Sequence, residues 1–436
     1  MDRRRGLQPG ATAEVTIEKG VYRGVGLARH DGQVVLVPRA LPGDRLRVRV
    51  ESAERGYARA VSESLLDPGP GRRPSPCRYV PKCGGCVYQE LDYDAQLELK
   101  EAILRESLAR AGAAWAGEVV VHGSPEGSWR MRASFHVSAT ADGVRIGLHE
   151  EGSHRVVDLD GCLQLSPAMT RAVGAARAAL GGRANWARGV TGLDLAESPD
   201  GGRLVLAVES RLSAAEATAL SGLADEIPWL TGLGVVVGPP GARRYLSLRG
   251  DPHIEAAVRG FRLRAHVRSF FQANRFLLED LVSEVVDGVP GGGAVLDLYA
   301  GVGLFALPLA ARAEAVTAVE INPSAAEDAA FNAQAAGLSN LGVERADVQR
   351  ALAGLPASPA ERVVLDPPRS GAGPEVARAI AGRRPQVIVY VSCDPPTLGR
   401  DLVAFAREGY RPTRVALFDL FPDTAHLETV VHLAPA

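Results

Sequence analysis

The stretch that decides the fold is residues 295–305, which read Val-Leu-Asp-Leu-Tyr-Ala-Gly-Val-Gly-Leu-Phe. The first four residues are mostly apolar, as in a buried strand. Gly301 and Gly303 then permit a tight turn whose backbone can approach a ligand closely. The apolar run that follows predicts a helix, and the N-terminus of a helix favours negative charge. We therefore expect a strand, a glycine-rich turn and a helix that together bind a ligand.

Beyond this turn, apolar strands alternate with helical segments from about residue 270 onward. The strands are expected at residues 294–298, 315–320, 362–366 and 387–392. This alternation is typical of a doubly wound α/β sheet, in which ligands bind outside the carboxyl ends of the strands. Residues at those strand ends are therefore the candidate site residues.

Two acids at these strand ends suit a nucleotide cofactor. Glu320 ends the strand about twenty residues beyond the glycine turn, where a carboxylate can accept both ribose hydroxyls. Asp347 lies where this fold contacts adenine, although a solvated loop acid explains it nearly as well. The pattern Asp-x-x-x-Gly-x-Gly is that of class I methyltransferases. A dinucleotide-binding dehydrogenase stays an alternative, because Ala306 can replace the third glycine of its fingerprint.

The next two strands end in reactive sequences. One ends in Asp366-Pro-Pro-Arg and the other in Ser-Cys393-Asp-Pro. Paired prolines form a rigid edge to a pocket. A lone cysteine is more often a buried apolar residue, but at the carboxyl end of a strand in this fold it lies at the rim of the ligand site. Cys393 is therefore a candidate nucleophile.

The N-terminal segment is predicted to be a small β-barrel, because short strands separated by Gly and Pro run through residues 12–66. Residues 1–66 contain twelve Arg and Lys against eight Asp and Glu, whereas the whole chain of 436 residues has a net charge of −2. This composition predicts a local basic surface. A solvated barrel with scattered charge would have the same composition.

The central segment, residues 67–268, is predicted to be an α+β region in which Ser213 and Glu216 form a capping box at the start of one helix. Four of its residues are cysteines that could bind a metal or cluster: Cys77, Cys83, Cys86 and Cys162. Their spacing leaves zinc and an iron–sulfur cluster nearly even. We find no secretory signal and no apolar run long enough to span a bilayer, so we expect a cytoplasmic protein with no membrane partner.

Several motifs in the same order resemble the RNA uracil-5-methyltransferase family over essentially the whole chain. Besides the two reactive sequences, they are Phe270-Phe-Gln272-x-Asn274 and Asp419-Leu-Phe-Pro-x-Thr-x-His426-x-Glu428. The resemblance implies three parts. These are an OB-like TRAM barrel that binds RNA at residues 1–66, the α+β region with a four-cysteine cluster at 67–268, and a class I Rossmann-like methyltransferase domain at 269–436.

The resemblance also implies S-adenosylmethionine as the cofactor and a covalent mechanism. Cys393 would add to C6 of uracil, which activates C5, and Glu428 would remove the C5 proton. The implied cofactor contacts are Gln272, Tyr299, Gly301, Gly303, Glu320, Asp347 and Asp366. Leu304 departs from the family, in which many members have a polar residue. Family members with this arrangement of cysteines hold a [4Fe–4S] cluster, which favours iron–sulfur over zinc.

The basic barrel and the cysteines resemble the members that act on ribosomal RNA, so 23S rRNA is the favoured partner of an enzyme expected to be a monomer. Transfer RNA stays an alternative. So does an RNA-binding iron–sulfur protein without catalysis, although the intact Cys393 and Glu428 argue against it. A DNA cytosine-5 methyltransferase would carry its cysteine after the strand that here ends in Asp366. Trp129, which stands among arginines, is interpreted either as an RNA contact or as the start of a strand.

Overall fold

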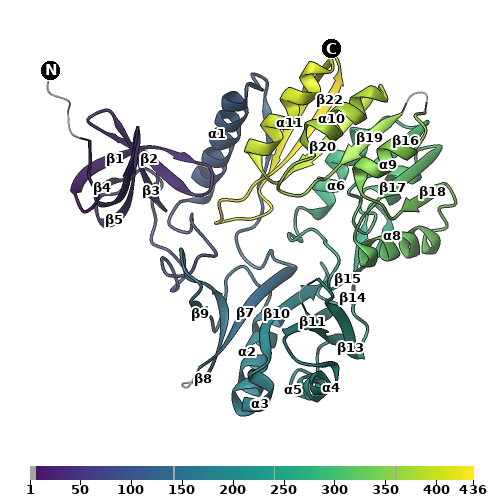
Figure 1. The fold of residues 1–436 in the computed structure, drawn as a ribbon, viewed down its shortest axis with the longest axis horizontal. Coiled ribbons are helices and arrows are strands. Elements are labelled where there is room, and N and C mark those ends of the chain that lie inside the picture. The colour runs from purple at the N-terminus through teal and green to yellow at the C-terminus, as the bar shows by residue number, and fades with distance from the viewer. Residues whose placement is uncertain (1–5, 141–142, 240, 359–360) are drawn as a thin grey trace.

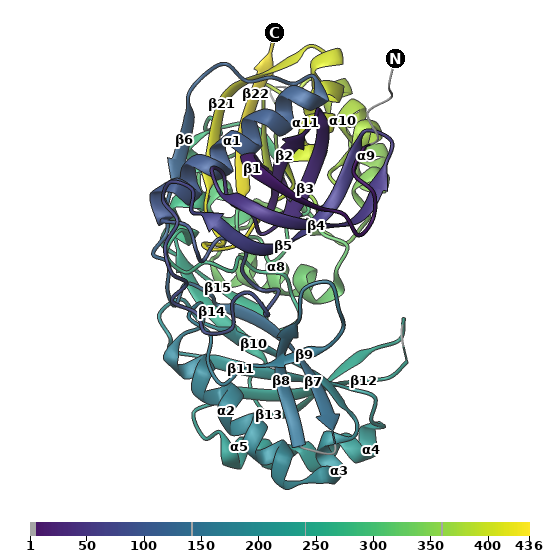
Figure 2. The same ribbon diagram turned by 90° about the vertical axis from the view of Figure 1, so that its left-hand side faces the viewer.

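The computed structural model describes residues 6–140, 143–239, 241–358 and 361–436, so residues 1–5 of the expected barrel segment lie outside the described residues. Figure 1 shows the barrel at the left, a sheet with helices at the bottom, and a larger sheet flanked by helices at the upper right. After a quarter turn, in Figure 2, the barrel lies in front of the C-terminal part and the central sheet stays below. In the part of the chain that is described, no helix is long and apolar enough to cross a membrane.

The N-terminal strands close into a barrel, as predicted. Among the described residues its strand order is β1-β2-β3-β5-β4. Inward residues alternate with outward ones along β1 and β4, which buries one apolar row from each strand. The bounds are β1 Thr12–Val21, β2 Val25–His30, β3 Gln33–Pro38, β4 Arg45–Glu54 and β5 Tyr57–Asp67.

The central segment forms a sheet whose order, over the described residues, is β13-β12-β11-β10-β7-β8-β9. The predicted capping box is present, with Ser213 and Glu216 bonded reciprocally. The strands are β7 Arg132–Thr140, β8 Gly143–His149, β9 Val156–Asp158, β10 Val190–Glu197, β11 Leu204–Ser210, β12 Gly232–Val237 and β13 Arg244–Gly250, followed by the hairpin β14 His253–Val258 and β15 Phe261–His266. The helices are α2 Pro167–Gly182, α3 Ala184–Ala187, α4 Ala214–Ala217, the 3-10 helix Thr218–Gly222 and α5 Leu223–Glu226.

The C-terminal sheet has the order β18-β17-β16-β19-β20-β22-β21-β6 within the described residues. Strands β16 to β20 are parallel, and β22 returns antiparallel to β20. The predicted doubly wound sheet is therefore confirmed. Its strands are β16 Ala294–Leu298, β17 Ala315–Val319, β18 Leu341–Glu344, β19 Arg362–Leu365, β20 Val387–Ser392, β21 Tyr410–Phe418 and β22 Glu428–Pro435. Its helices are α6 Leu278–Asp287, α7 Ala306–Ala310, α8 Pro323–Ala335, α9 Val348–Gly354, α10 Gly373–Gly382 and α11 Pro395–Arg407.

Two elements from the central segment join this C-terminal part. Strand β6, Val119–His122, pairs in parallel with β21 at the sheet edge. Helix α1, Tyr93–Ala111, lies beside α11 (Figure 1). The fully buried Lys100 Nζ of α1 lies 2.6 Å from Oδ1 of the equally buried Asp419 and donates to Phe421 O at 3.1 Å. The boundaries at residues 66 and 268 stay predictions.

We expect Lys100→Met to destabilise the protein by about 3 kcal/mol, because it leaves Asp419 buried without its partner. The matched control is Lys19→Met, since the Lys19–Glu106 pair is partly exposed and such pairs contribute at most about 1 kcal/mol. The measurement is the urea midpoint of both variants followed by circular dichroism. Equal midpoints would contradict a structural role for the buried pair.

Candidate active site

The glycine turn adopts the backbone that its sequence predicts. Tyr299, Gly301 and Gly303 have φ angles of 62°, 55° and 87°. A Cβ at Gly303 would lie 2.7 Å from Leu307 Cδ1, so a larger residue fits neither the angle nor the space. Glu320 Oε2 accepts a hydrogen bond from Gly301 N at 2.9 Å, which brings the turn and the acid of the next strand together.

Asp297, inside β16, is a site residue that the sequence analysis quoted in a pattern but did not select. It is 0% exposed, and neither carboxyl oxygen has a hydrogen-bond partner among the described residues. Burial, followed by the nearby charges of Asp366 and Glu320, raises the pKa of Asp297 well above its usual value. Its position four residues before Gly301, in the pattern Asp-x-x-x-Gly-x-Gly, could have identified it from the sequence. An orphaned buried carboxyl beside two others fits a site for a polar, cationic ligand.

Asp347 precedes α9 and lies near Tyr299 of the turn. The exposed Asp347 caps α9, because its Oδ1 accepts from Gln349 N at 2.9 Å and Arg350 N at 3.3 Å. Burial and the charge of Asp347 raise the pKa of Tyr299 to about 12, so the two side chains are close. Asp347 therefore has a structural role as a helix cap besides its expected cofactor contact.

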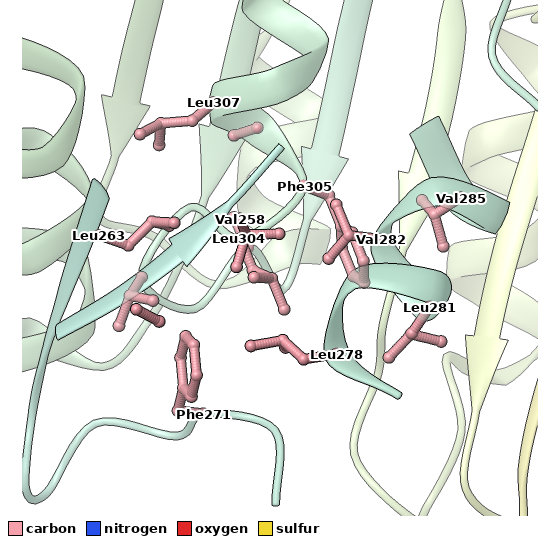
Figure 3. Close-up of a cluster of buried hydrophobic side chains, with 14 of the residues drawn as sticks. Val258, Leu263, Phe271, Leu278, Leu281, Val282, Val285, Leu304, Phe305 and Leu307 are labelled. Atoms are coloured by element: carbon pink, nitrogen blue, oxygen red, sulfur yellow. The ribbon is translucent and has the colours of Figure 1, made fainter. Parts of the chain in front are cut away.

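Leu304 is buried in an apolar cluster with Val258, Leu278 and Phe271, which Figure 3 shows. Its departure from the polar residue of many family members therefore has a packing explanation.

The strand register brings Cys393 and Glu428 together. The last pair between β20 and β22 is Ser392 with Thr429, and the residues immediately beyond this pair on the two strands are Cys393 and Glu428. Asp366 follows β19, the strand that pairs with β20 on its other side. Gln272, which is 3% exposed, points its Nε2 at Asp366 Oδ2 at 3.4 Å.

The electrostatics of this group are dominated by burial and by like charge. Burial, then Glu428 and Asp366, raise the pKa of Cys393 to about 12, while Arg369 acts in the opposite direction. Burial and the charge of Asp366 also raise the pKa of Glu428, which is 4% exposed. Burial raises the pKa of Asp366 as well. The free protein therefore holds a protonated thiol among carboxyl groups that resist ionisation.

A cleft of about 1030 Å³ opens beside Asp394, the residue that follows Cys393. Tyr22 and Arg23 of the barrel line it, together with Arg369, Asp394 and residues 149–154 of the β8–β9 turn. The cleft lies among the barrel, the central sheet and the C-terminal sheet, so all three parts can contact one substrate.

The four candidate metal ligands come together from two segments. Cys77, Cys83, Cys86 and Cys162 line one small cavity of about 20 Å³, and Gln164 Nε2 lies 3.0 Å from Cys86 Sγ. Burial raises the pKa of Cys83, Cys86 and Cys162. Across the described residues, however, no group of three or more His, Cys, Asp or Glu side chains is arranged to hold a metal ion. The donor chemistry therefore suits a metal or cluster, but the thiols are not preformed ligands.

The cysteine loop contacts the segment that precedes Glu428. Val87 N and Tyr88 N both donate to Asp423 O at 2.9 Å, and Gln89 Nε2 donates to Asp423 Oδ2 at 2.9 Å.

Trp129 lies in the same region, and the interpretation of Trp129 as an RNA contact is wrong. Its ring is 0% exposed and packs edge-on against Phe421, 5.7 Å between centroids.

The raised pKa of Asp366 gives a test of this site. Between its ordinary pKa of 3.8 and its folded-state pKa of about 7, the Asp366 carboxyl is ionised in the unfolded chain but protonated in the folded protein. Stability is therefore lost as the pH rises toward the higher folded pKa. We expect Asp366→Asn to raise the thermal unfolding midpoint, and by more at pH 8 than at pH 5. Asp347→Asn, at an exposed cap, is the control, and a gain independent of pH would contradict the assignment.

Two family descriptions match the chain. The TRAM domain matches residues 6–61, which contain all of β1 to β4. The tRNA (Uracil-5-)-methyltransferase family matches residues 251–435, which include the glycine turn, Asp366, Cys393 and Glu428.

Individual relatives match from end to end. The 23S rRNA (uracil(1939)-C(5))-methyltransferase RlmD of Chromohalobacter salexigens is 34% identical, over 97% of this chain and 90% of that protein. RlmD of Alkalilimnicola ehrlichii is also 34% identical, over 99% and 98%. The crystal structure of the Pyrococcus abyssi tRNA (uracil-54, C5)-methyltransferase in complex with S-adenosyl-L-homocysteine is 26% identical. It has a TM-score of 0.76 over 96% of this chain and 99% of that one.

Proposed function

Because this chain belongs to the family of RNA uracil-5-methyltransferases, we propose that it methylates C5 of a uridine in 23S rRNA with S-adenosylmethionine. The observation that carries the proposal is the register of β20 and β22, which sets the Cys393 thiol beside the buried Glu428 carboxyl, next to Asp394 in the lining of a large cleft. A nucleophile and a base on neighbouring strands suit addition to a pyrimidine ring followed by loss of a proton from that ring.

The cofactor would bind around the glycine turn. Gly301 and Gly303 would let the backbone approach it, Glu320 would accept from its ribose hydroxyls, and Asp347 with Tyr299 would contact its adenine. Gln272 and Asp366 lie between the turn and Cys393, where the methionine end would reach. S-adenosylmethionine, when bound, supplies an electrophilic methyl group and a positive charge.

Cys393 acts first. Its thiolate forms a bond to C6 of uracil, and the C5–C6 π electrons move into the carbonyl as an enolate, which makes C5 nucleophilic. The thiol is protonated in the free protein, so its proton must leave for the solvent as uracil and the cofactor bind, and Glu428 stays free to accept the C5 proton. Positive charge at the site and Arg369 both favour the thiolate over the thiol.

Glu428 completes the reaction after C5 has gained its methyl group. Its carboxylate takes the C5 proton, the electrons of that bond restore the C5–C6 double bond, and the bond from C6 to sulfur breaks. Cys393 leaves as a thiolate and is ready for another cycle. The positive charge of the bound cofactor would favour the ionised form of Glu428, and its raised pKa makes that carboxylate a stronger base than an exposed glutamate.

The RNA class is argued from the relatives. The RlmD proteins share 34% identity with this chain and match both its barrel and its cysteine segment, which favours 23S rRNA. Transfer RNA is the second candidate, because the P. abyssi enzyme shares the fold over the whole chain. The target base must leave its stack to reach Cys393, so a single-stranded loop is the expected context.

We expect purified protein to transfer label from S-adenosylmethionine to 5-methyluridine in unmodified 23S rRNA. The measurement is nucleoside analysis after digestion, with transfer RNA transcripts in parallel. Label in transfer RNA alone would move the substrate to that class, and label in another nucleoside would refute the C5 assignment.

Two variants test the mechanism in the same assay. Cys393→Ala should give neither label nor covalent complex. Glu428→Gln should accumulate an RNA–protein complex that survives denaturation, because the C5 proton cannot leave and the sulfur bond persists. Turnover by Cys393→Ala would rule out the adduct.

We also propose that the four cysteines hold a [4Fe–4S] cluster with a structural role. The support is the four-thiolate donor set and the resemblance to iron–sulfur members, since the chemistry of the donors alone suits zinc equally. Protein purified without oxygen should contain iron and sulfide in equal amounts. Cys162→Ser should lose the iron, whereas Cys393→Ala should retain it. Zinc without sulfide would overturn the cluster.

A further inference from the structure

A tyrosine of the barrel reaches the loop that carries the nucleophile. Tyr22 follows β1, and its hydroxyl donates to Asp394 Oδ2 at 2.7 Å, across 372 positions of the chain. Burial and the neighbouring Asp394 raise the pKa of Tyr22, so the hydroxyl keeps its proton and stays a donor. Asp394, the residue after Cys393, is itself buried.

Asp394 organises the start of α11. Its second carboxyl oxygen, Oδ1, caps that helix by accepting from Thr397 N at 3.0 Å, while Ser392 Oγ accepts from Asp394 N at 3.3 Å. One oxygen of the carboxylate therefore faces the helix and the other faces the barrel. Cys393 stands between Ser392 and Asp394, both of which are held by these bonds.

The end of the barrel that carries Tyr22 contacts helix α1 at two points. Lys19 Nζ lies 2.8 Å from Glu106 Oε1 on α1. Gly20 packs so closely on the same helix that a Cβ there would lie 2.6 Å from Leu99 Cδ1. Tyr22 is thus presented to Asp394 by a fixed contact between the barrel and α1, which in turn packs on α11.

We propose that Tyr22 is a positioning residue that fixes the loop of Cys393, so that the barrel contributes to the rate of nucleophilic attack as well as to binding. This inference rests on the proposed function, because it assumes that Cys393 is the nucleophile. Without the hydroxyl, Asp394 Oδ2 is a buried carboxylate oxygen that must find another donor, and the residue beside Cys393 then shifts.

The test is single-turnover adduct formation with RNA that contains 5-fluorouridine. The C5 fluorine cannot be removed as a proton can, so the methylated adduct stays bound to Cys393 and can be counted on a denaturing gel. At saturating RNA and S-adenosylmethionine, we expect Tyr22→Phe to form the adduct about tenfold more slowly, the size of a lost hydrogen bond to a charged group. The dissociation constants of RNA and cofactor should not change.

Tyr57→Phe is the matched control. Tyr57 lies on β5 and is half-buried like Tyr22, but among the described residues its hydroxyl has no hydrogen-bond partner, so the rate should stay at the wild-type value. Asp394→Asn provides a second variant, because Asn keeps an acceptor for Thr397 N. The double variant with Tyr22→Phe should be no slower than the slower single variant, since both remove one interaction.

The outcomes separate the two proposals. If the wild-type protein forms no adduct on any RNA tested, the proposed function fails. If it forms the adduct and Tyr22→Phe does so at the same rate, the positioning role is wrong and the proposed function stands. Multiplicative effects in the double variant, or a slower rate explained by weaker RNA binding alone, would also overturn the positioning role.

Discussion

Antiparallel pairing of β22 with β20 is the constraint on which the rest of the site depends. The pair of Ser392 with Thr429 fixes which residues come next on the two strands, and these are Cys393, just beyond β20, and Glu428, the first residue of β22. Successive side chains alternate between the faces of a strand, so a slip of one residue would separate the two groups. The register is held by the buried residues of both strands, among them Tyr390 and Val431, so the packing of the core also sets the geometry of the chemistry.

The site also brings together several carboxyl groups whose ionisation is disfavoured in the free protein. Burial raises the pKa of Asp297, Asp366 and Glu428, with Arg369 acting in the opposite direction on Glu428. The ionised form of such a buried carboxyl is unfavourable alone and is stabilised by a nearby cation. A sulfonium cofactor would offset the carboxylates and lower the pKa of the neighbouring thiol, so the protein would produce its thiolate when the cofactor is present. Formation of the Cys393 thiolate would then depend on the bound cofactor in addition to Arg369.

The barrel, the doubly wound sheet and several candidate site residues could be predicted from the sequence, because each is indicated by a short stretch of residues. Strand ends in a doubly wound sheet indicated Glu320, Asp366 and Cys393, and alternation indicated the barrel. Contacts between distant segments carried no such signal. No local pattern indicated that α1 and β6 join the C-terminal sheet, or that the Asp297 carboxyl is buried without a hydrogen-bond partner among the described residues. Trp129 was wrongly interpreted as a possible RNA contact because its arginines dominate the local pattern, whereas its ring packs on Phe421, nearly three hundred residues away.

These distant contacts converge on two short segments around Cys393 and Glu428, the proposed nucleophile and base. Lys100 of α1 and the cysteine loop both hold residues 419–423, which precede Glu428. Tyr22 of the barrel holds Asp394, beside Cys393. Each reactive group is therefore supported by parts of the chain that lie before the catalytic sheet in sequence. Because a displacement of about 1 Å at a reacting group can slow a reaction a hundredfold, the proposed mechanism would depend on the N-terminal and central segments for the position of both reactive groups.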